Sequence, residues 1–177
     1  MNYKKFLPFL LAFVLPVAAV YAWWGGFSPV DIREGMRGPY TYAYLEHSGD
    51  YSKLPEVAEE VRGLLKDGKV AYGLPISVLY SNPDLVDVGK RRSRTGFLVA
   101  VDARVRAPLQ IDSVPPRPVL IAQVRAGNLL APSRAYPALD RYLQAKGGGI
   151  RMPTVEIYEP SGSPFRMGLL TVEMPRP

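Results

Sequence analysis

Hydrophobic residues recur along this chain with two different periods. In residues 54–65 and 135–143 they follow the three-four spacing of an amphipathic helix. In residues 40–45, 75–80, 96–101, 119–124, 152–160 and 168–173 they form short alternating or continuous apolar runs. Glycine, proline or asparagine bounds many of these runs, which predicts strands. The expected element order is therefore strand-helix-strand-strand, written twice.

The two copies of this unit can be superimposed on the sequence. An offset of seventy-eight positions places Gly49 on Gly127, Pro75 on Pro153 and Tyr80 on Tyr158. Two such units predict an α+β fold, in which an antiparallel curved sheet carries two helices on its outer face. The inner faces would meet at a pseudo-twofold axis and form a central cleft, which is the default ligand site.

This cleft is expected to be rich in tyrosine and to carry one carboxylate. Side chains alternate along a strand, so Thr154, Glu156 and Tyr158 share one face. Under the repeat Val78 corresponds to Glu156, which makes the cleft symmetric in shape but not in charge. The tyrosines predicted to line it are Tyr80, Tyr158, Tyr40, Tyr42 and Tyr44. Glu156 among aromatic rings indicates recognition of a cation, although an exposed glutamate on an open sheet face would show the same pattern.

Composition excludes several classes of site. The 177 residues include no cysteine and one histidine, so disulfides, thiolate chemistry and a His/Cys metal centre are ruled out, and no metal or cofactor is expected. The net charge of +6 is small for a nucleic-acid-binding protein, and no nucleic-acid partner is expected. Lys90 and Arg91 lie in a basic loop that could contact anionic lipid headgroups or a protein partner, whereas Arg92 could be structural.

Residues 1–29 resemble a targeting segment, and residues 30–177 form the predicted domain. Lys4 and Lys5 precede an uncharged run that is just long enough to cross a bilayer as a helix, and Trp23 and Trp24 would anchor its edge. This pattern predicts an uncleaved, single-pass signal anchor. The alternative is a signal peptide cleaved after Ala22. Both interpretations place the domain on the extracytoplasmic side, either periplasmic or at the cell surface.

Several stretches resemble the GyrI-like (gyrase-inhibitor-like, effector-binding) domain family over roughly residues 30–174. They are the duplicated unit itself, the opening Gly38-Pro-Tyr-Thr-Tyr-Ala-Tyr-Leu-Glu-His-Ser-Gly49, the turn Tyr80-Ser-Asn-Pro83 with Gly89-Lys-Arg-Arg92, and Pro153-Thr-Val-Glu-Ile-Tyr158. With its N-terminal segment and residues 137–142, the chain is most similar to the membrane-anchored branch that includes the vertebrate testis-expressed ER-phagy receptor. The resemblance implies that Glu156 matches the acidic residue with which multidrug-sensing members bind cationic aromatic ligands.

The expected function is binding of a small cationic or aromatic ligand, or of a partner, without catalysis. The chain has no helix-turn-helix segment, so a drug-responsive transcription factor is not expected. One alternative is a hydrolase of reactive electrophiles that uses Glu156 with Tyr158 or Tyr80, as a small branch of the family does. The other is a membrane adaptor with a vestigial cleft.

Overall fold

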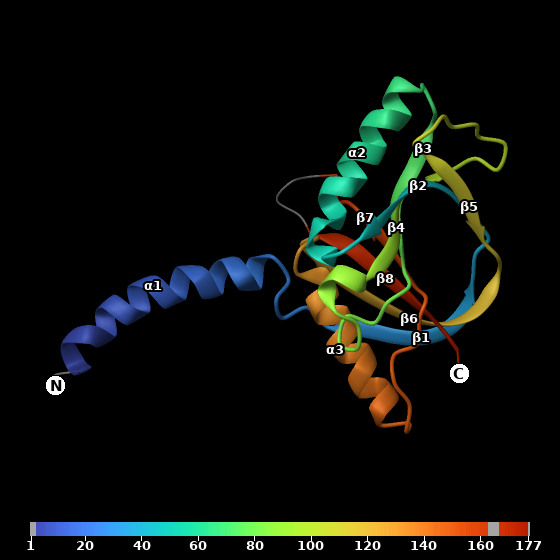
Figure 1. The fold of residues 1–177 in the computed structure, drawn as a ribbon. Coiled ribbons are helices and arrows are strands. Elements are labelled where there is room, and N and C mark those ends of the chain that lie inside the picture. The colour runs from blue at the N-terminus through green and yellow to red at the C-terminus, as the bar shows by residue number, and fades with distance from the viewer. Residues whose placement is uncertain (1–2, 163–166, 177) are drawn as a thin grey trace.

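A computed structural model describes residues 3–162 and 167–176, and its central feature is an antiparallel sheet of eight strands (Figure 1). The elements in chain order are α1 (Tyr3–Trp23), β1 (Val30–Arg37), β2 (Tyr40–Ser48), α2 (Leu54–Asp67), β3 (Tyr72–Leu79), β4 (Arg92–Val99), β5 (Gln110–Val114), β6 (Arg117–Ala126), α3 (Ala131–Gln144), β7 (Thr154–Glu159) and β8 (Gly168–Pro175). The predicted α+β class, with a curved antiparallel sheet, is confirmed.

The strand order of the sheet is symmetric about its centre. It runs β1-β6-β8-β7-β3-β4-β2-β5, so the units β2-α2-β3-β4 and β6-α3-β7-β8 are related about a point between β7 and β3. At this junction Ser77 pairs with Glu156, and Val78 pairs with Val155. The centre of the sheet is therefore the place where the two copies of the duplicated unit meet.

The two edge strands are exchanged between the halves. Strand β1 leads into β2 but pairs with β6, and β5 leads into β6 but pairs with β2. The sequence analysis missed both strands. In β1 the alternation of Val30 and Ile32 ends at Glu34, and β5 is only five residues long and stops at Pro115-Pro116. The edge strand of each half of the sheet therefore comes from the segment of chain that leads into the other half.

Helices α2 and α3 both lie on the outer face of the sheet, each over its own half, with their N-terminal ends closest to each other (Figure 1). Helix α2 buries Val61 and Leu65 against β2 and β4, and α3 buries Leu139 and Leu143 against β6 and β8. Each fully buried side chain of this size contributes about 1.5–3 kcal/mol. Among the described residues, only the N-terminal parts of α2 and α3 cover the outer face of the central strands β3 and β7.

The opposite face of the sheet has its own apolar cluster. Its buried members are Tyr42, Tyr44, Ile76, Val78, Val114, Val155 and Ile157. These residues alternate along their strands with those that face the helices, as the period of two requires. Any residue can therefore be assigned to one face of the sheet by its register.

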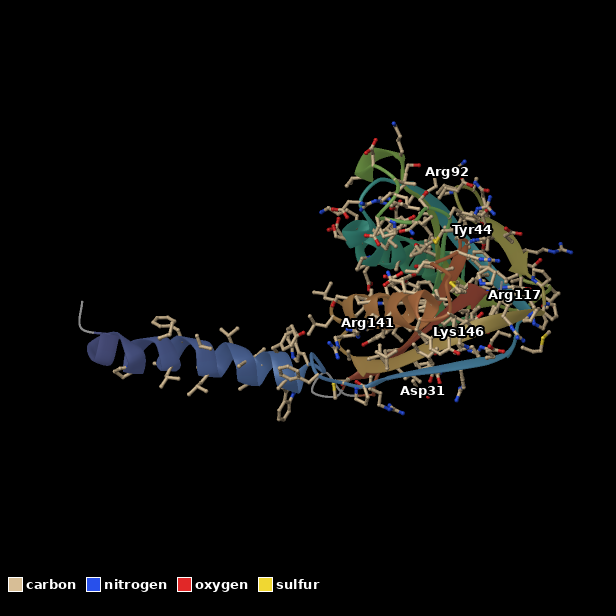
Figure 2. All side chains as sticks on the ribbon, turned by 90° about the horizontal axis from the view of Figure 1, so that it is seen from below. Asp31, Tyr44, Arg92, Arg117, Arg141 and Lys146 are labelled. Atoms are coloured by element: carbon tan, nitrogen blue, oxygen red, sulfur yellow. The ribbon has the colours of Figure 1, made fainter. Side chains whose placement is uncertain are left out.

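Helix α1 projects away from the sheet as a single helix of 21 residues (Figures 1 and 2). In the described part of the chain, no helix combines the length and apolar character needed to cross a bilayer. The predictions of a single-pass anchor, of the membrane as a partner through this helix, and of a membrane location are therefore wrong. Pro8 and Pro16 lie inside α1, where neither can donate a backbone hydrogen bond.

Candidate functional site

A cavity of about 420 Å³ lies on the outer face of the sheet, between the N-terminal parts of α2 and α3. The sequence analysis had placed the cleft on the inner face. The cavity wall is largely apolar, and α2, α3, β3, β4, β7 and β8 all contribute to it. Its lining includes Tyr51, Ser77, Pro83, Arg91, Thr95, Tyr136, Glu156 and Tyr158.

Glu156 is the carboxylate of this cavity. It is half-buried on β7, directly across from Ser77 of β3. The Tyr136 hydroxyl donates to Glu156 Oε1 at 2.7 Å and also lies 2.9 Å from Thr154 Oγ1. Because Tyr136 contacts only Oε1, the second carboxylate oxygen has no protein partner among the described residues.

The surroundings of Glu156 disfavour its charged form. Burial raises the pKa of the Glu156 carboxyl above its usual value, and the hydrogen bond from Tyr136 opposes part of this rise. Burial also raises the pKa of Tyr136 well above 10, with the nearby Glu156 carboxylate adding to the effect. Tyr136 is therefore a neutral hydrogen-bond donor at physiological pH. The other ionisable side chains on the cavity wall are Tyr51, Tyr158 and Arg91.

Tyr158 lies one alternation beyond Glu156 on the same face, as expected. Its hydroxyl donates to the Ala126 carbonyl at 3.3 Å, and burial raises its pKa. The ring packs directly on Gly168 of β8, where a Cβ atom would overlap it. Gly168 therefore gives this ring room to lie flat at the cavity wall.

The remaining predicted tyrosines do not meet Glu156. Tyr42 and Tyr44 belong to the apolar cluster of the opposite face, together with Val78, and Tyr40 packs against the same cluster. Tyr80 also lies on that side, because the guanidinium of Arg94 contacts both its ring and that of Tyr44. The predicted site residues that do not line the helix-side cavity are therefore Tyr40, Tyr42, Tyr44, Tyr80 and Val78.

The tyrosines of the opposite face already enclose a cation of the protein itself. Arg94 lies 4.8 Å from the Tyr44 ring centroid and 5.4 Å from that of Tyr80. It also pairs with Glu46 at 3.1 Å and with Asp112 at 2.6 Å. The aromatic rings that the sequence assigned to a ligand cation are thus occupied by Arg94.

The basic loop between β3 and β4 has one residue in solvent and one at the cavity. Lys90 is exposed and pairs with Asp87 at 3.3 Å. Arg91 donates from Nε to the Val86 carbonyl at 3.0 Å and from Nη2 to the Pro83 carbonyl at 2.7 Å. Contact of this loop with anionic lipid remains a prediction.

The sequence analysis missed two tyrosines of the site. Tyr136 borders the buried stripe of α3, but nothing in a helical period reveals which strand residue it will meet. Tyr51 precedes α2, and its hydroxyl lies 3.0 Å from the Ser81 carbonyl and 2.9 Å from the Arg92 carbonyl, which share its single proton. Tyr51 thereby ties the β3–β4 loop to the start of α2 beside the cavity.

A second buried carboxylate, Glu173 of β8, lies outside the cavity. Its side chain is 0% exposed and accepts from Tyr40 at 2.6 Å, Arg37 at 2.8 Å and Arg117 at 3.1 Å. Burial and the bond to Glu173 raise the pKa of Tyr40 to about 12. These partners come from β2, β1 and β6, and Figure 2 shows Arg117 at the end of the sheet remote from α1. This cluster joins the strands at the corner where the edge strands exchange.

Comparison with known proteins gives structural likeness only. No family model matches the chain, and no curated protein matches it. The C-terminal domain of EcmrR has a TM-score of 0.64 at 10% identity, covering 84% of this chain and 97% of that one. SAV2435 bound to tetraphenylphosphonium has a TM-score of 0.55 at 7% identity, with coverages of 81% and 93%. A putative transcription regulation protein from Staphylococcus aureus MU50 has a TM-score of 0.51 at 9% identity, with coverages of 82% and 99%.

EcmrR has also been seen in a complex with DNA, and that chain gives a TM-score of 0.63 at 8% identity, with coverages of 98% and 68%. At such identities the likeness concerns the fold alone. It supports the GyrI-like, effector-binding fold that the sequence resemblance had suggested.

Proposed function

We propose that this chain is a GyrI-like binding domain that holds a small aromatic cation in the cavity between α2 and α3, with Glu156 as its counter-ion. The observation that carries the proposal is the position of Glu156, a carboxylate on an apolar cavity wall with one oxygen left without a protein partner. No arginine or lysine in the described residues forms an ion pair with it.

The energetics favour a cationic ligand. An unpaired carboxylate in an apolar environment is costly, and a ligand cation would offset that cost. The rings of Tyr51 and Tyr158 line the same wall, and a cation over an aromatic face gains up to about 2 kcal/mol when it is desolvated. The SAV2435 structure holds tetraphenylphosphonium, which is a cation of this chemical class.

The hydrolase alternative requires Glu156 and a tyrosine at one site. Tyr80 lies on the other side of the sheet, so only Tyr158 would remain from the predicted pair. Hydrolysis of an electrophile and an adaptor role both stay predictions. Titration of the wild type with a cationic and a neutral ligand tests the adaptor role.

Substitution of Glu156 by glutamine should weaken binding of tetraphenylphosphonium at least about tenfold, a change of about 1.4 kcal/mol. Glutamine keeps the volume and can still accept from Tyr136, but it carries no charge. Binding of neutral triphenylphosphine oxide should change little. Isothermal titration calorimetry measures the affinity of each ligand for the wild type and for the variant.

The matched control is Glu159→Gln, an exposed residue on the same strand, which should leave both affinities unchanged. Equal losses for the cation and the neutral ligand would show that Glu156 has only a structural role. Absence of binding of either ligand to the wild type would favour the adaptor.

Cation binding should weaken as the pH falls through the raised pKa of Glu156, because protonation removes the counter-charge. Tyr136→Phe removes the hydrogen bond that stabilises the carboxylate, so the pKa should rise further. The midpoint of the pH dependence of tetraphenylphosphonium affinity should then move to higher pH. Tyr142→Phe, on the same helix but bonded to Lys146, is the control and should not move it. A midpoint that stays in place or falls in Tyr136→Phe would contradict the assignment.

A further inference from the structure

Arg91 brings a positive charge to the same cavity that holds Glu156. It lines the wall together with Pro83 and Tyr51, and its guanidinium carbon lies 5.9 Å from the Tyr51 ring centroid. Its bonds to the carbonyls of Val86 and Pro83 use Nε and Nη2 and neutralise no charge. The cavity therefore has two charged groups of opposite sign on one apolar wall.

The strand register fixes the spacing between these two groups. Glu156 is level with Ser77, which pairs with Thr95 of β4. Arg91 precedes Thr95 by four positions, an even number, so both side chains lie on the helix side of the sheet. Four extended residues span about 13 Å along the strand, and β7 and β4 are two strand spacings of about 4.8 Å apart. The backbone positions of the two charged residues are thus about 16 Å apart, and both side chains line the cavity between them.

The Arg91 guanidinium retains free donor capacity. It has five N–H groups, and the two bonds to the loop leave Nη1 without a partner among the described residues. The same residues contain no ion pair to Arg91 within 4 Å. Arg91 also helps to lower the pKa of Asp50, although the hydrogen bonds from Ser52 are the main cause of that shift. An arginine with an unused face at a cavity wall is suited to a carboxylate.

We propose that the cavity selects amphoteric ligands, that is, aromatic cations that also carry an anionic group. The cationic centre would lie at Glu156 and the anionic group at Arg91. This proposal rests on the proposed function and narrows it, because a purely cationic ligand would leave Arg91 unmatched and would be repelled by it. The loop contacts of Arg91 hold its guanidinium in place before the ligand arrives, which lowers the entropic cost of the contact.

Two rhodamine dyes provide a matched test. Rhodamine 110 is a zwitterion with a free carboxylate, and rhodamine 123 is its methyl ester, a simple cation with the same ring system. We expect the wild-type protein to bind rhodamine 110 about tenfold more tightly at neutral pH, the effect of one charge-assisted hydrogen bond. Arg91→Gln should remove this preference and leave rhodamine 123 affinity unchanged or slightly higher. Lys90→Gln, the neighbouring exposed residue, should keep the preference. Fluorescence polarisation measures the affinity of both dyes for the wild type, for these two variants and for Glu156→Gln.

The possible outcomes separate the two proposals. If the wild type binds rhodamine 123 as tightly as rhodamine 110 or more tightly, and Glu156→Gln weakens that binding, the amphoteric proposal is overturned and the cation site stands. If neither dye binds, both proposals fail. The wild-type preference is measured without any substitution, so it decides the question even if Arg91→Gln disrupts the loop.

Discussion

Glu173→Gln should lower the free energy of unfolding by about 3 kcal/mol. Glu173 is fully buried and accepts hydrogen bonds from Arg37, Tyr40 and Arg117. Glutamine removes the negative charge and leaves two guanidinium groups without their counter-ion. Because the Arg37 and Arg117 side chains are 33% and 19% exposed, solvent screens part of the loss, which places the effect at the lower end of the range for a broken buried pair.

Urea denaturation followed by circular dichroism measures this change. Glu34→Gln is the control, since Glu34 pairs with Arg176 where both side chains are nearly half exposed, and it should cost less than about 1 kcal/mol. A similar small loss in both variants would show that the exchanged corner does not depend on the Glu173 cluster. Tetraphenylphosphonium affinity of folded Glu173→Gln should equal that of the wild type, because this cluster lies outside the cavity.

Gly96→Ala should also be strongly destabilising, by about 3 kcal/mol. Gly96 lies in the interior of β4 and pairs with Tyr44 on one side and Ile76 on the other. A Cβ atom at this position would overlap the Ala43 carbonyl oxygen and lie 2.8 Å from Tyr44 Cα. Both are backbone atoms of the adjacent strand, so relief requires β2 to move away from β4 and lose ladder hydrogen bonds.

Thermal unfolding should show this as a drop in Tm of roughly 6–12 °C for a chain of this size. Gly73→Ala is the matched control on β3, where the nearest atom to a new Cβ, Leu98 Cβ, lies at an ordinary contact distance of 3.5 Å. Its Tm should stay within about 2 °C of the wild type. A Gly96→Ala variant as stable as Gly73→Ala would mean that the two strands are less tightly apposed than the structure shows.

The hydrophobic pattern predicted most of the elements because both helices and the central strands bury one side only. The expected helical stripes fall within α2 and α3, and the strand predicted over residues 152–160 contains β7. The alternation along β7 also placed Glu156 and Tyr158 on one face. Local periodicity was sufficient for these features, since each depends only on residues close together in the chain.

The residues that line the cavity were harder to predict. They depend on whether odd-numbered or even-numbered residues face the helices on each of several strands that are distant in sequence. On β3 the helix-facing residues are odd-numbered, as Ser77 and Leu79 show, whereas on β7 they are even-numbered. An offset that relates equivalent faces must therefore be odd, and the offset of seventy-eight is even. Because the offset was even, Val78 was matched with Glu156, although Ser77 is the residue that faces the same side as Glu156. The same offset matched Tyr80 with Tyr158, although these two tyrosines lie on opposite faces of the sheet.

The N-terminal prediction failed for a different reason. A count of uncharged residues measured the length of the run but not how apolar it is, and no helix in the described part of the chain is both long and apolar enough to cross a bilayer. The predicted tyrosine-lined cleft illustrates a similar limit. Three alternating tyrosines on β2 indicate a shared face, but their sequence gives no sign that Arg94 from β4 fills the space above them.

Because β1 and β5 are exchanged, neither half of this molecule contains all of its own strand pairings. A fragment comprising β1, β2, α2, β3 and β4 would hold β1 with no β6 to pair with, and its β2 would lack the neighbour that β5 supplies. In a dimer of two identical fragments, however, β1 of each copy could pair with β2 of the other copy. Such an interlocked homodimer would reproduce the strand order of this sheet, and in the single chain the segment between β4 and β5 connects the two halves.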